Sequence, residues 1–403
     1  TKAGHRMKTK IHIALMVTEE GLPLRWELLP GNLSENTVLP SWIDYLAKQP
    51  DFEPCVLIFD RGMPSVDNFH KLVDESDGHL FLTSVKSGAI PGYVELDSDC
   101  LDALQRIDDE ADIKEVDRAC AQLGLELYAR QTFARDLGKV RSLKPTHRRR
   151  PPPLKGYLYF NREVQKIKRQ KRQERIERVH KRVRELNDDL SQAKQSRREK
   201  PTVRKVTRAL DKQKVTHLFD VQLDGIEIQG KTRKIKSFRI HLQLKEDELR
   251  HSRRYDGITL LVGHPKLEWS LSQAISAYRN KTVVEADFRT IKSVLDLMPV
   301  LHWTDSKIAA HVTLCVMSLL VERLIELRLA SSSLAQRDDW PKTANALLKR
   351  LGCVMLNRIQ VGRSYLTKRT QAPDQVEEYL EQIGAKSLLG CHGTTVEVPM
   401  NTM

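Results

Sequence analysis

Residues Tyr278 to Ser293, YRNKTVVEADFRTIKS, hold the most informative pattern of the chain. Their spacing is Tyr-x2-Lys-x3-Glu-x6-Lys, which selects Tyr278, Lys281, Glu285 and Lys292. Steps of three, four and seven residues place these side chains on one face of an α-helix, which we predict over Leu271 to Leu295. A carboxylate can hold a hard divalent metal ion, and the cations and the phenol can hold phosphates around it. The spacing alone favours a solvated, salt-bridged helix face, and the rest of the chain shifts the interpretation towards a site.

A second carboxylate stands at the end of a predicted strand. Cys55 to Phe59 (CVLIF) is a short apolar run, as expected of a buried strand, and Asp60-Arg61-Gly62 follows it. Together with Glu285, Asp60 could hold Mg²⁺ or Mn²⁺ at a phosphodiester, as in two-metal sites. The alternative is that Asp60 is an ordinary turn residue and Arg61 an ordinary surface cation.

The charge of the chain is concentrated in one segment. The 403 residues have a formal net charge of +14, and residues 161–214 contain 20 Lys or Arg against 8 Asp or Glu, a net of +12. Such a balance indicates a polyanionic partner, nucleic acid or a membrane surface, although like-charge blocks can also be solvated and partly disordered. The longest apolar run, 312–321, is too short to cross a bilayer, and the six cysteines form no Cys-x-x-Cys pair. We therefore expect a cytoplasmic protein without a membrane partner.

The order of predicted elements gives an α/β fold class. Strands are expected over 10–17, 22–29, 55–59 and 80–85, with helices over 39–47, capped by Ser34 or Asn36, and 65–74. A strand is expected over 125–133, and 139–155, which contains RRRPPP, is expected to be a basic linker. A seam of apolar residues predicts a helical hairpin in which Pro201 ends the first helix: Ile176, Val179, Val183, Leu186, Leu190, Ala193.

The last third of the chain, from Leu271, is predicted to be helical, and strands are expected before it. Strands over 217–223 and 237–244, with a turn at Asp224-Gly225, and a short strand over 260–262 precede the helix that contains Glu285. Further helices are expected over 306–329, 342–350 and 373–383.

With these two carboxylate segments in this order, the chain resembles the DDE transposases of bacterial insertion sequences. The matching segments are FDRG at 59–62 and the signature that begins at Tyr278, supported by GLPLRWELLPGNLSEN at 21–36, YDGI at 255–258 and HWTDSKIAAHVTLCVMSLLVERL at 302–324. Most members have Arg where this chain has Lys281, and Lys cannot make the bidentate phosphate contact that Arg makes.

The resemblance implies a ribonuclease H-like core interrupted by an inserted basic helical and β domain, with a helical C-terminal part. The implied domains are 1–86, the first part of the core; 87–265, the insertion with its basic helices at 161–214; 266–330, the second part of the core; and 331–403, a C-terminal extension.

The resemblance also implies the chemistry. Asp60 and Glu285 would be the second and third acids of a metal site for two Mg²⁺ or Mn²⁺ ions, and Tyr278, Lys281, Lys292 and Arg61 would contact phosphates. The reaction would be hydrolysis at the transposon ends, followed by attack of the freed 3′ hydroxyl on target DNA. The implied partners are double-stranded DNA and a second copy of the chain, as a homodimer on DNA.

The first acid of the family's triad has no counterpart in this sequence. In the family it lies shortly before the hairpin that begins here at Lys10, and residues 1–9 (TKAGHRMKT) contain no Asp or Glu. We therefore expect that the sequence is truncated after the first catalytic strand, and that this polypeptide alone cannot assemble a complete metal site. Two alternatives stay open: a catalytically dead remnant that binds DNA, and another ribonuclease H-like nuclease.

Overall fold

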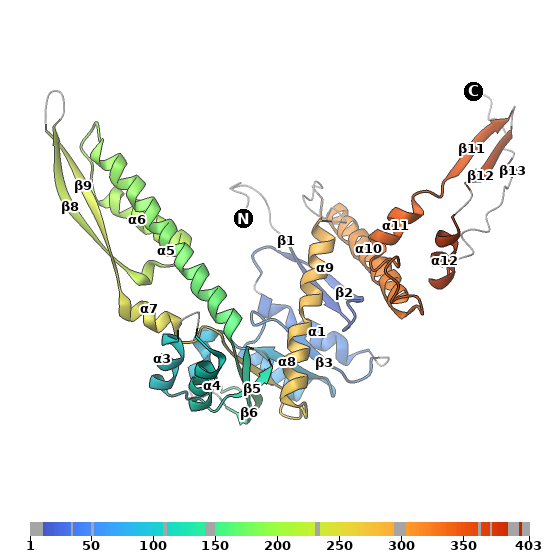
Figure 1. Cartoon of the computed structure of the whole chain (residues 1–403), viewed down its shortest axis with the longest axis horizontal. Helices are drawn as coiled ribbons and strands as arrows, with labels where there is room; N and C mark the ends of the chain where they lie inside the picture. The colour runs from blue at the N-terminus through green and yellow to red at the C-terminus, as the bar shows by residue number, and fades with distance from the viewer. Residues whose placement is uncertain are drawn as a thin grey trace. The chain divides into compact units, whose positions relative to one another are not determined.

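Figure 1 shows the computed structural model, which describes residues 11–33, 35–49, 52–107, 111–129, 131–141, 150–229, 234–293, 304–361, 364–370, 373–385 and 395–396. The chain divides into two units: the first combines Thr1–Ser34 with Arg279–Met403, and the second is Glu35–Tyr278. The structure is mixed α/β, as predicted, and its largest sheet contains parallel and antiparallel strands. The predicted domain boundaries after residues 86 and 265 both fall inside the second unit.

The first unit contains the predicted N-terminal hairpin. Strands β1 (Ile11–Val17) and β2 (Pro23–Pro30) pair antiparallel, with Ile11 opposite Pro30. Gly21 in the turn has φ +88°, a conformation that glycine adopts without steric cost. Four hairpin side chains pack against a buried cluster formed by helices α9 (Thr282–Ser293) and α10 (Asp305–Ser331): Ile13, Leu15, Trp26, Leu28.

Helix α10 is the longest apolar element of the first unit, and the structure confirms the prediction of a helix here. By length and composition alone it could cross a membrane, a test that the core helix of a soluble protein also passes. Five of its side chains are buried: Val312, Cys315, Val316, Leu319, Leu329. Its first four buried residues form the cluster beneath the hairpin, so this part of α10 serves as a core helix of the unit.

The C-terminal part of the first unit surrounds the end of α10. Helices α11 (Ala344–Leu351) and α12 (Asp374–Gln382) share a core with Leu329 and Trp340. Strands β11 (Leu356–Val361), β12 (Ser364–Arg369) and β13 (Thr395–Val396) form an antiparallel sheet that was not predicted. The two predicted helices in this region are confirmed.

The second unit is built on a six-stranded sheet of order β3-β4-β10-β7-β6-β5. Its strands are β3 (Val56–Phe59), β4 (Leu80–Ser84), β5 (Glu126–Ala129), β6 (Thr132–Val140), β7 (Leu154–Asn161) and β10 (Ile258–Gly263). Only β3 and β4 pair in parallel, and the other neighbours are antiparallel. Strands from both sides of the predicted boundary at residue 86 therefore share one sheet.

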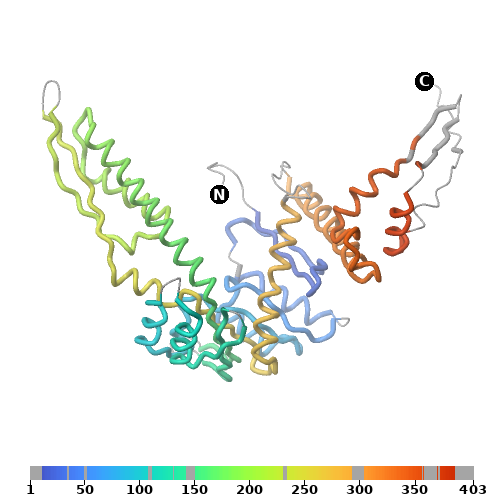
Figure 2. The backbone as a smooth tube through the Cα atoms, in the orientation of Figure 1, coloured from blue at the N-terminus to red at the C-terminus, as the bar shows by residue number. Residues whose placement is uncertain are grey.

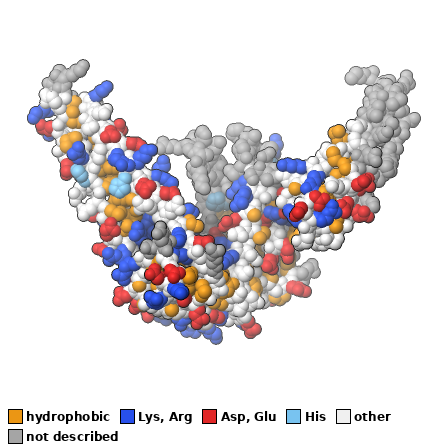
Figure 3. All heavy atoms as spheres, in the orientation of Figure 1, with side chains coloured by type: hydrophobic (Ala, Val, Ile, Leu, Met, Phe, Trp, Pro, Cys, Tyr) orange, Lys and Arg blue, Asp and Glu red, His pale blue; other side chains and the backbone are white. Residues whose placement is uncertain are grey.

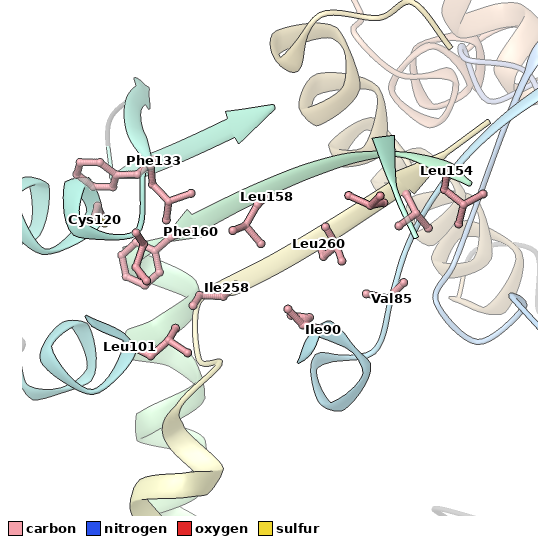
Figure 4. Packing of buried hydrophobic residues seen from close by; sticks show 14 of the residues in the cluster. Val85, Ile90, Leu101, Cys120, Phe133, Leu154, Leu158, Phe160, Ile258 and Leu260 are labelled. Carbon is pink, nitrogen blue, oxygen red and sulfur yellow. The ribbon is translucent and has the colours of Figure 1, made fainter. Parts of the chain in front are cut away.

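The two faces of this sheet are covered by different helices. One face packs against α1 (Leu39–Ala47), α2 (Val66–Asp74), α3 (Ser98–Arg106) and α4 (Ile113–Gln122). Figure 4 shows part of this core, with Leu158 and Leu260 of the sheet facing it. The other face packs against α8 (Leu271–Asn280) through the neighbouring strand positions Tyr157 and Leu261. Side chains therefore alternate between two buried faces, as the period of a strand requires.

A basic arm extends the second unit. It consists of α5 (Arg162–Ser191), α6 (Glu199–Gln213), β8 (Phe219–Gln229), β9 (Lys234–Leu244) and α7 (Glu246–Arg253). Figure 2 shows the β8–β9 hairpin running beside the two long helices. All six residues of the predicted apolar seam are buried, and five of them pack with residues of α6, β8 and β9. The helical hairpin is thus confirmed.

Several local predictions were wrong. Helix α5 ends at Ser191, and Pro201 lies in the first turn of α6, where proline is tolerated because the first backbone N–H groups of a helix have no helical acceptor. Asp224 and Gly225 lie within β8, whose hairpin turn falls outside the described residues. The strand predicted over 125–133 is two strands, β5 and β6, with Gln131 at φ +61° between them.

The predicted helix caps had mixed outcomes. Helix α1 begins after Val38, which makes no side-chain cap; Asn36 lies in a preceding 3₁₀ turn, and Ser34 is outside the described residues. Ser65, for which no cap was predicted, caps α2, since its hydroxyl accepts a hydrogen bond from the Asn68 N–H at 3.1 Å. The middle of the predicted basic linker, 142–149, is also outside the described part of the chain, and its two ends belong to β6 and β7 rather than to a linker.

Candidate functional site

Asp60 occupies the first position after β3. Phe59, its neighbour, is buried, and the Phe59 carbonyl accepts a hydrogen bond from the Thr83 hydroxyl of β4 at 2.9 Å. The Asp60 side chain is exposed. Ligands of α/β sheets often bind beyond the carboxyl ends of parallel strands, and β3–β4 is the parallel pair of this sheet. The position predicted for Asp60 is therefore confirmed, at an accessible strand end.

The turn that follows β3 uses one oxygen of the Asp60 carboxylate. The Arg61 N–H donates to Asp60 Oδ1 at 2.8 Å, and the Met63 N–H donates to the Asp60 carbonyl at 3.1 Å. These are the hydrogen bonds of an Asp turn, so the turn role is present whatever else the carboxylate does. The Arg61 side chain is exposed.

Tyr278 lies in a different environment from the one predicted. It belongs to α8, is only 6% exposed, and packs in the cluster between that helix and the sheet. Its hydroxyl is 2.6 Å from the hydroxyl of Ser84, at the end of β4. In this position Tyr278 fastens α8 to the sheet, and its phenol is turned into the core.

The other three signature residues follow a helix break. The single helix predicted over 271–295 is two helices, α8 and α9, with Lys281 in the turn between them, so the prediction of one continuous face was wrong. Glu285, in the first turn of α9, and Lys292, in its last turn, are both exposed. They are seven residues apart and therefore share one face of α9. Lys281 is half-buried.

Lys292 also has a local contact. Its Nζ lies 5.5 Å from the centre of the Phe288 ring, within the range of a cation–π interaction. Asp60 and Tyr278 belong to the second unit, and Lys281, Glu285 and Lys292 belong to the first.

The sequence interpretation missed a buried ion pair on α9. Asp287 is 0% exposed, and its Oδ1 accepts hydrogen bonds from Arg323 of α10, from Nε at 2.8 Å and from a terminal nitrogen at 2.7 Å. Its Oδ2 is buried without a hydrogen-bond partner in the described part of the chain. Burial raises the pKa of Asp287, and the hydrogen bond from Arg323 opposes that shift. The signal was present, because Asp287 stands four residues from both Val283 and Ile291 and so shares their core-facing side.

The Asp287 side chain also lies against the N-terminal hairpin. A Cβ added to Gly21 would lie 2.8 Å from Val283 Cγ1 and 3.4 Å from Asp287 Oδ2. The turn of the hairpin therefore approaches α9 as closely as only a glycine allows. This packing fixes the helix that presents Glu285.

The basic arm supplies the strongest positive charge. On α5 four exposed cations recur at spacings of four, three and four residues and so form one stripe: Lys171, Arg175, Arg178, Arg182. Two of them have acidic neighbours on the helix, Arg178 with Glu174 at 3.0 Å and Arg182 with Glu185 at 2.7 Å. Figure 3 shows Lys and Arg side chains over this arm, interspersed with acidic ones. Exposed pairs of this kind are weak, so the stripe remains available to a polyanion.

The donor chemistry of the two predicted acids suits a hard metal ion, since both are accessible carboxylates. Within the residues that the structure describes, no group of three or more His, Cys, Asp or Glu side chains could share a metal ion. The five cysteines in the same part of the chain are free thiols.

Comparisons with protein-family models, with curated proteins and with solved structures find no match to this chain.

Proposed function

We propose that this chain is the catalytic part of an insertion-sequence DNA transposase with a ribonuclease H-like core. The observation that carries the proposal is the setting of its two signature acids. Asp60 is exposed at the end of β3 in the parallel pair, within FDRG, and Glu285 is exposed on the same face of α9 as Lys292. Because both side chains are exposed, the packing of the core does not explain why acids stand at these two positions of the motifs.

The proposed roles follow from chemistry and exposure. Asp60 and Glu285 would each supply a carboxylate ligand for Mg²⁺ or Mn²⁺, which when bound would activate the attacking oxygen and stabilise the leaving oxygen of a phosphodiester. Lys281, Lys292 and Arg61 would contact DNA phosphates as cations. Tyr278 has its hydroxyl at Ser84, so we assign it the role of holding α8 on the sheet.

The basic arm is the proposed surface for double-stranded DNA. Lys and Arg side chains that neutralise phosphates release counterions, so affinity falls steeply as salt rises. The α5 stripe spaces four cations along about 16 Å of helix axis, since an α-helix rises 1.5 Å per residue. A salt-independent affinity for duplex DNA would contradict this assignment.

The second candidate is a DNA-binding protein that no longer cuts. The buried phenol of Tyr278 favours it, because a phosphate grip that uses this residue is not formed in this conformation. The two candidates agree on DNA binding and differ in cleavage. Another ribonuclease H-like nuclease would also cut DNA, but would not join the freed 3′ end to a target.

The test uses the protein expressed from its full reading frame, with supercoiled plasmid that carries the flanking genomic DNA and with Mg²⁺. We expect nicking and strand transfer, and a loss of at least about 100-fold in both for Asp60→Asn and for Glu285→Gln, because each removes a metal ligand worth several kcal/mol. Glu268→Gln is the matched control, since Glu268 is an exposed acid outside both motifs. Cleavage that survives Glu285→Gln would refute the proposal, and DNA binding without cleavage by the unaltered protein would select the second candidate.

A further inference from the structure

We propose that the second unit contains an anion site for phosphate groups at the base of α5, formed by Arg61, Lys168, Arg172 and Arg253. These residues, the α5-base cluster, come from the turn after β3, from the first turns of α5 and from the end of α7. That the phosphate belongs to a nucleic-acid backbone rests on the proposed function. The site itself rests on the charges and contacts of the cluster.

Among the described residues the cluster has one buried carboxylate, Asp256, which is already engaged, and one exposed carboxylate, Glu246, which acts on Arg253. Asp256 is 4% exposed and accepts two hydrogen bonds from Arg172, at 2.6 and 2.9 Å. Arg172 also donates to the Ser252 carbonyl at 3.1 Å. Both carboxylate oxygens of Asp256 are therefore used by Arg172, although Asp256 also attracts other cations of the cluster.

Two further cations are half-buried beside this pair. Lys168 lies one helical turn before Arg172 on α5, and the Nε of Arg253 is buried without a hydrogen-bond partner among the described residues. Burial lowers the pKa of Lys168, attraction to Asp256 opposes this, and Arg61 and Arg172 lower the pKa further. Burial lowers the pKa of Arg253 as well, Arg172 and Arg169 lower it further, and attraction to Glu246 and Asp256 opposes the shift. The positive charges of Lys168 and Arg253 are therefore partly removed from water.

Such an arrangement costs stability unless an anion completes it. Burying an ionised group without a partner is unfavourable, and like charges in proximity add to the cost. A phosphate presents several acceptor oxygens and negative charge, which fits both the fork of an Arg and the point charge of a Lys. A surface of solvated cations would leave Lys168 and Arg253 exposed, whereas both are half-buried.

The position of the cluster gives it a role in the proposed reaction. Arg61 directly follows Asp60, and its positive charge contributes to the lowered pKa of Lys168, so we assign the turn after β3 and the base of α5 to one phosphate-binding surface. A backbone phosphate bound here would hold DNA next to the Asp60 carboxylate. The stripe along α5 begins at Lys171, one helical turn further on, so the same strand of DNA could continue along the arm.

The test compares Lys168→Gln/Arg253→Gln with Lys114→Gln/Arg118→Gln, which removes the same two charges from exposed positions of α4. Anisotropy of a fluorescent DNA duplex is measured at several salt concentrations, and inorganic pyrophosphate is titrated against each protein by calorimetry. We expect the first variant to lose at least about tenfold in affinity for the duplex, with a salt slope shallower by about 1.8, because two phosphate contacts are lost. The control variant should keep both values.

The outcomes separate the site from the proposed function. If the unaltered protein binds pyrophosphate through Lys168 and Arg253 but does not bind the duplex, the anion site stands and the DNA assignment falls. If the two variants bind duplex and pyrophosphate equally well, the inference is overturned. The melting temperature checks folding, and we expect it to rise for Lys168→Gln/Arg253→Gln without an anion, since two strained charges are removed; a fall of several degrees would show that these cations serve the fold.

Discussion

The hydroxyl groups of Tyr278 and Ser84 lie 2.6 Å apart, in the core between α8 and the six-stranded sheet. This contact joins residues that are 194 positions apart in the chain. Ser84 is 3% exposed and Tyr278 6% exposed, so water can barely replace either partner. The first residue of the signature motif is therefore a structural residue in this conformation.

Replacing Tyr278 by Phe is expected to lower the free energy of unfolding by about 1–3 kcal/mol, because it leaves the Ser84 hydroxyl buried without a partner. Urea denaturation measures the change. Tyr128→Phe is the control: its hydroxyl is 3.2 Å from that of Ser272 at an exposed site, and a change within about 0.5 kcal/mol is expected. If Tyr278→Phe behaves like the control and instead weakens DNA binding, the phenol is a phosphate ligand.

Replacing Gly257 by Ala is expected to destabilise the second unit strongly. Gly257 has φ +82°, and an added Cβ would lie 2.6 Å from the Phe160 ring and 2.8 Å from the Asn161 carbonyl oxygen. Backbone strain of this kind costs about 1–3 kcal/mol, and the overlap with backbone adds to it. Gly225→Ala, at a site with nothing within 4 Å, is the comparison. Equal melting temperatures for the two variants would show that the turn before β10 relaxes easily.

Replacing Asp256 by Asn is expected to cost about 3–5 kcal/mol, since it leaves the cations of the α5-base cluster without their buried carboxylate. Added salt should restore part of the loss by screening their repulsion. Asp136→Asn removes an exposed pair with Lys155, at 2.8 Å, and should cost at most about 1 kcal/mol. Chemical denaturation in low and high salt decides, and a loss that does not respond to salt contradicts the charge explanation.

The pH dependence of the first unit should carry the signature of Asp287. Burial raises its pKa above the ordinary value of 3.8, so the folded state binds a proton that the unfolded state has released. The free energy of unfolding contributed by this group is therefore greatest below pH 3.8 and falls as pH rises through the folded pKa. Urea midpoints of the unaltered protein and of Asp287→Asn across this range give the measurement. As pH rises, the unaltered protein should lose stability relative to Asp287→Asn. If it gains stability relative to Asp287→Asn instead, the attraction of Arg323 for the Asp287 carboxylate outweighs the effect of burial.

The periodic segments of this fold could be predicted from sequence. The alternation of apolar residues in 10–17 and 22–29 predicted the hairpin. The apolar runs before Asp60 and near Leu80 predicted β3 and β4. The apolar seam from Ile176 to Ala193 predicted a buried helix face. In each of these segments the hydrophobic period is local and strong. Helices α3 and α4 were missed although their apolar residues recur at helical spacing, because the charged residues between them obscured the pattern.

Part of the candidate site could also be predicted from local sequence, and part of it could not. Sequence placed Asp60 at a strand end and Glu285 with Lys292 on one helix face, since both follow from local geometry. It gave no indication that the helix breaks at Lys281, that Tyr278 turns inward to Ser84, or that Arg323 pairs with Asp287. Each of these depends on a partner from a distant segment.

By itself, then, the sequence determined the elements with a clear hydrophobic period, the concentration of positive charge in the arm, and the motifs on which the proposed function rests. Only the tertiary structure decided which charged and polar groups are buried and which partners they find. The residues around Asp256 illustrate this, because Arg172 of α5 and Arg253 of α7 come from separate segments, and this one buried carboxylate bonds the first and attracts the second. The physical reason is that desolvation and pairing depend on what surrounds a charge in space, and the chain order does not specify those surroundings.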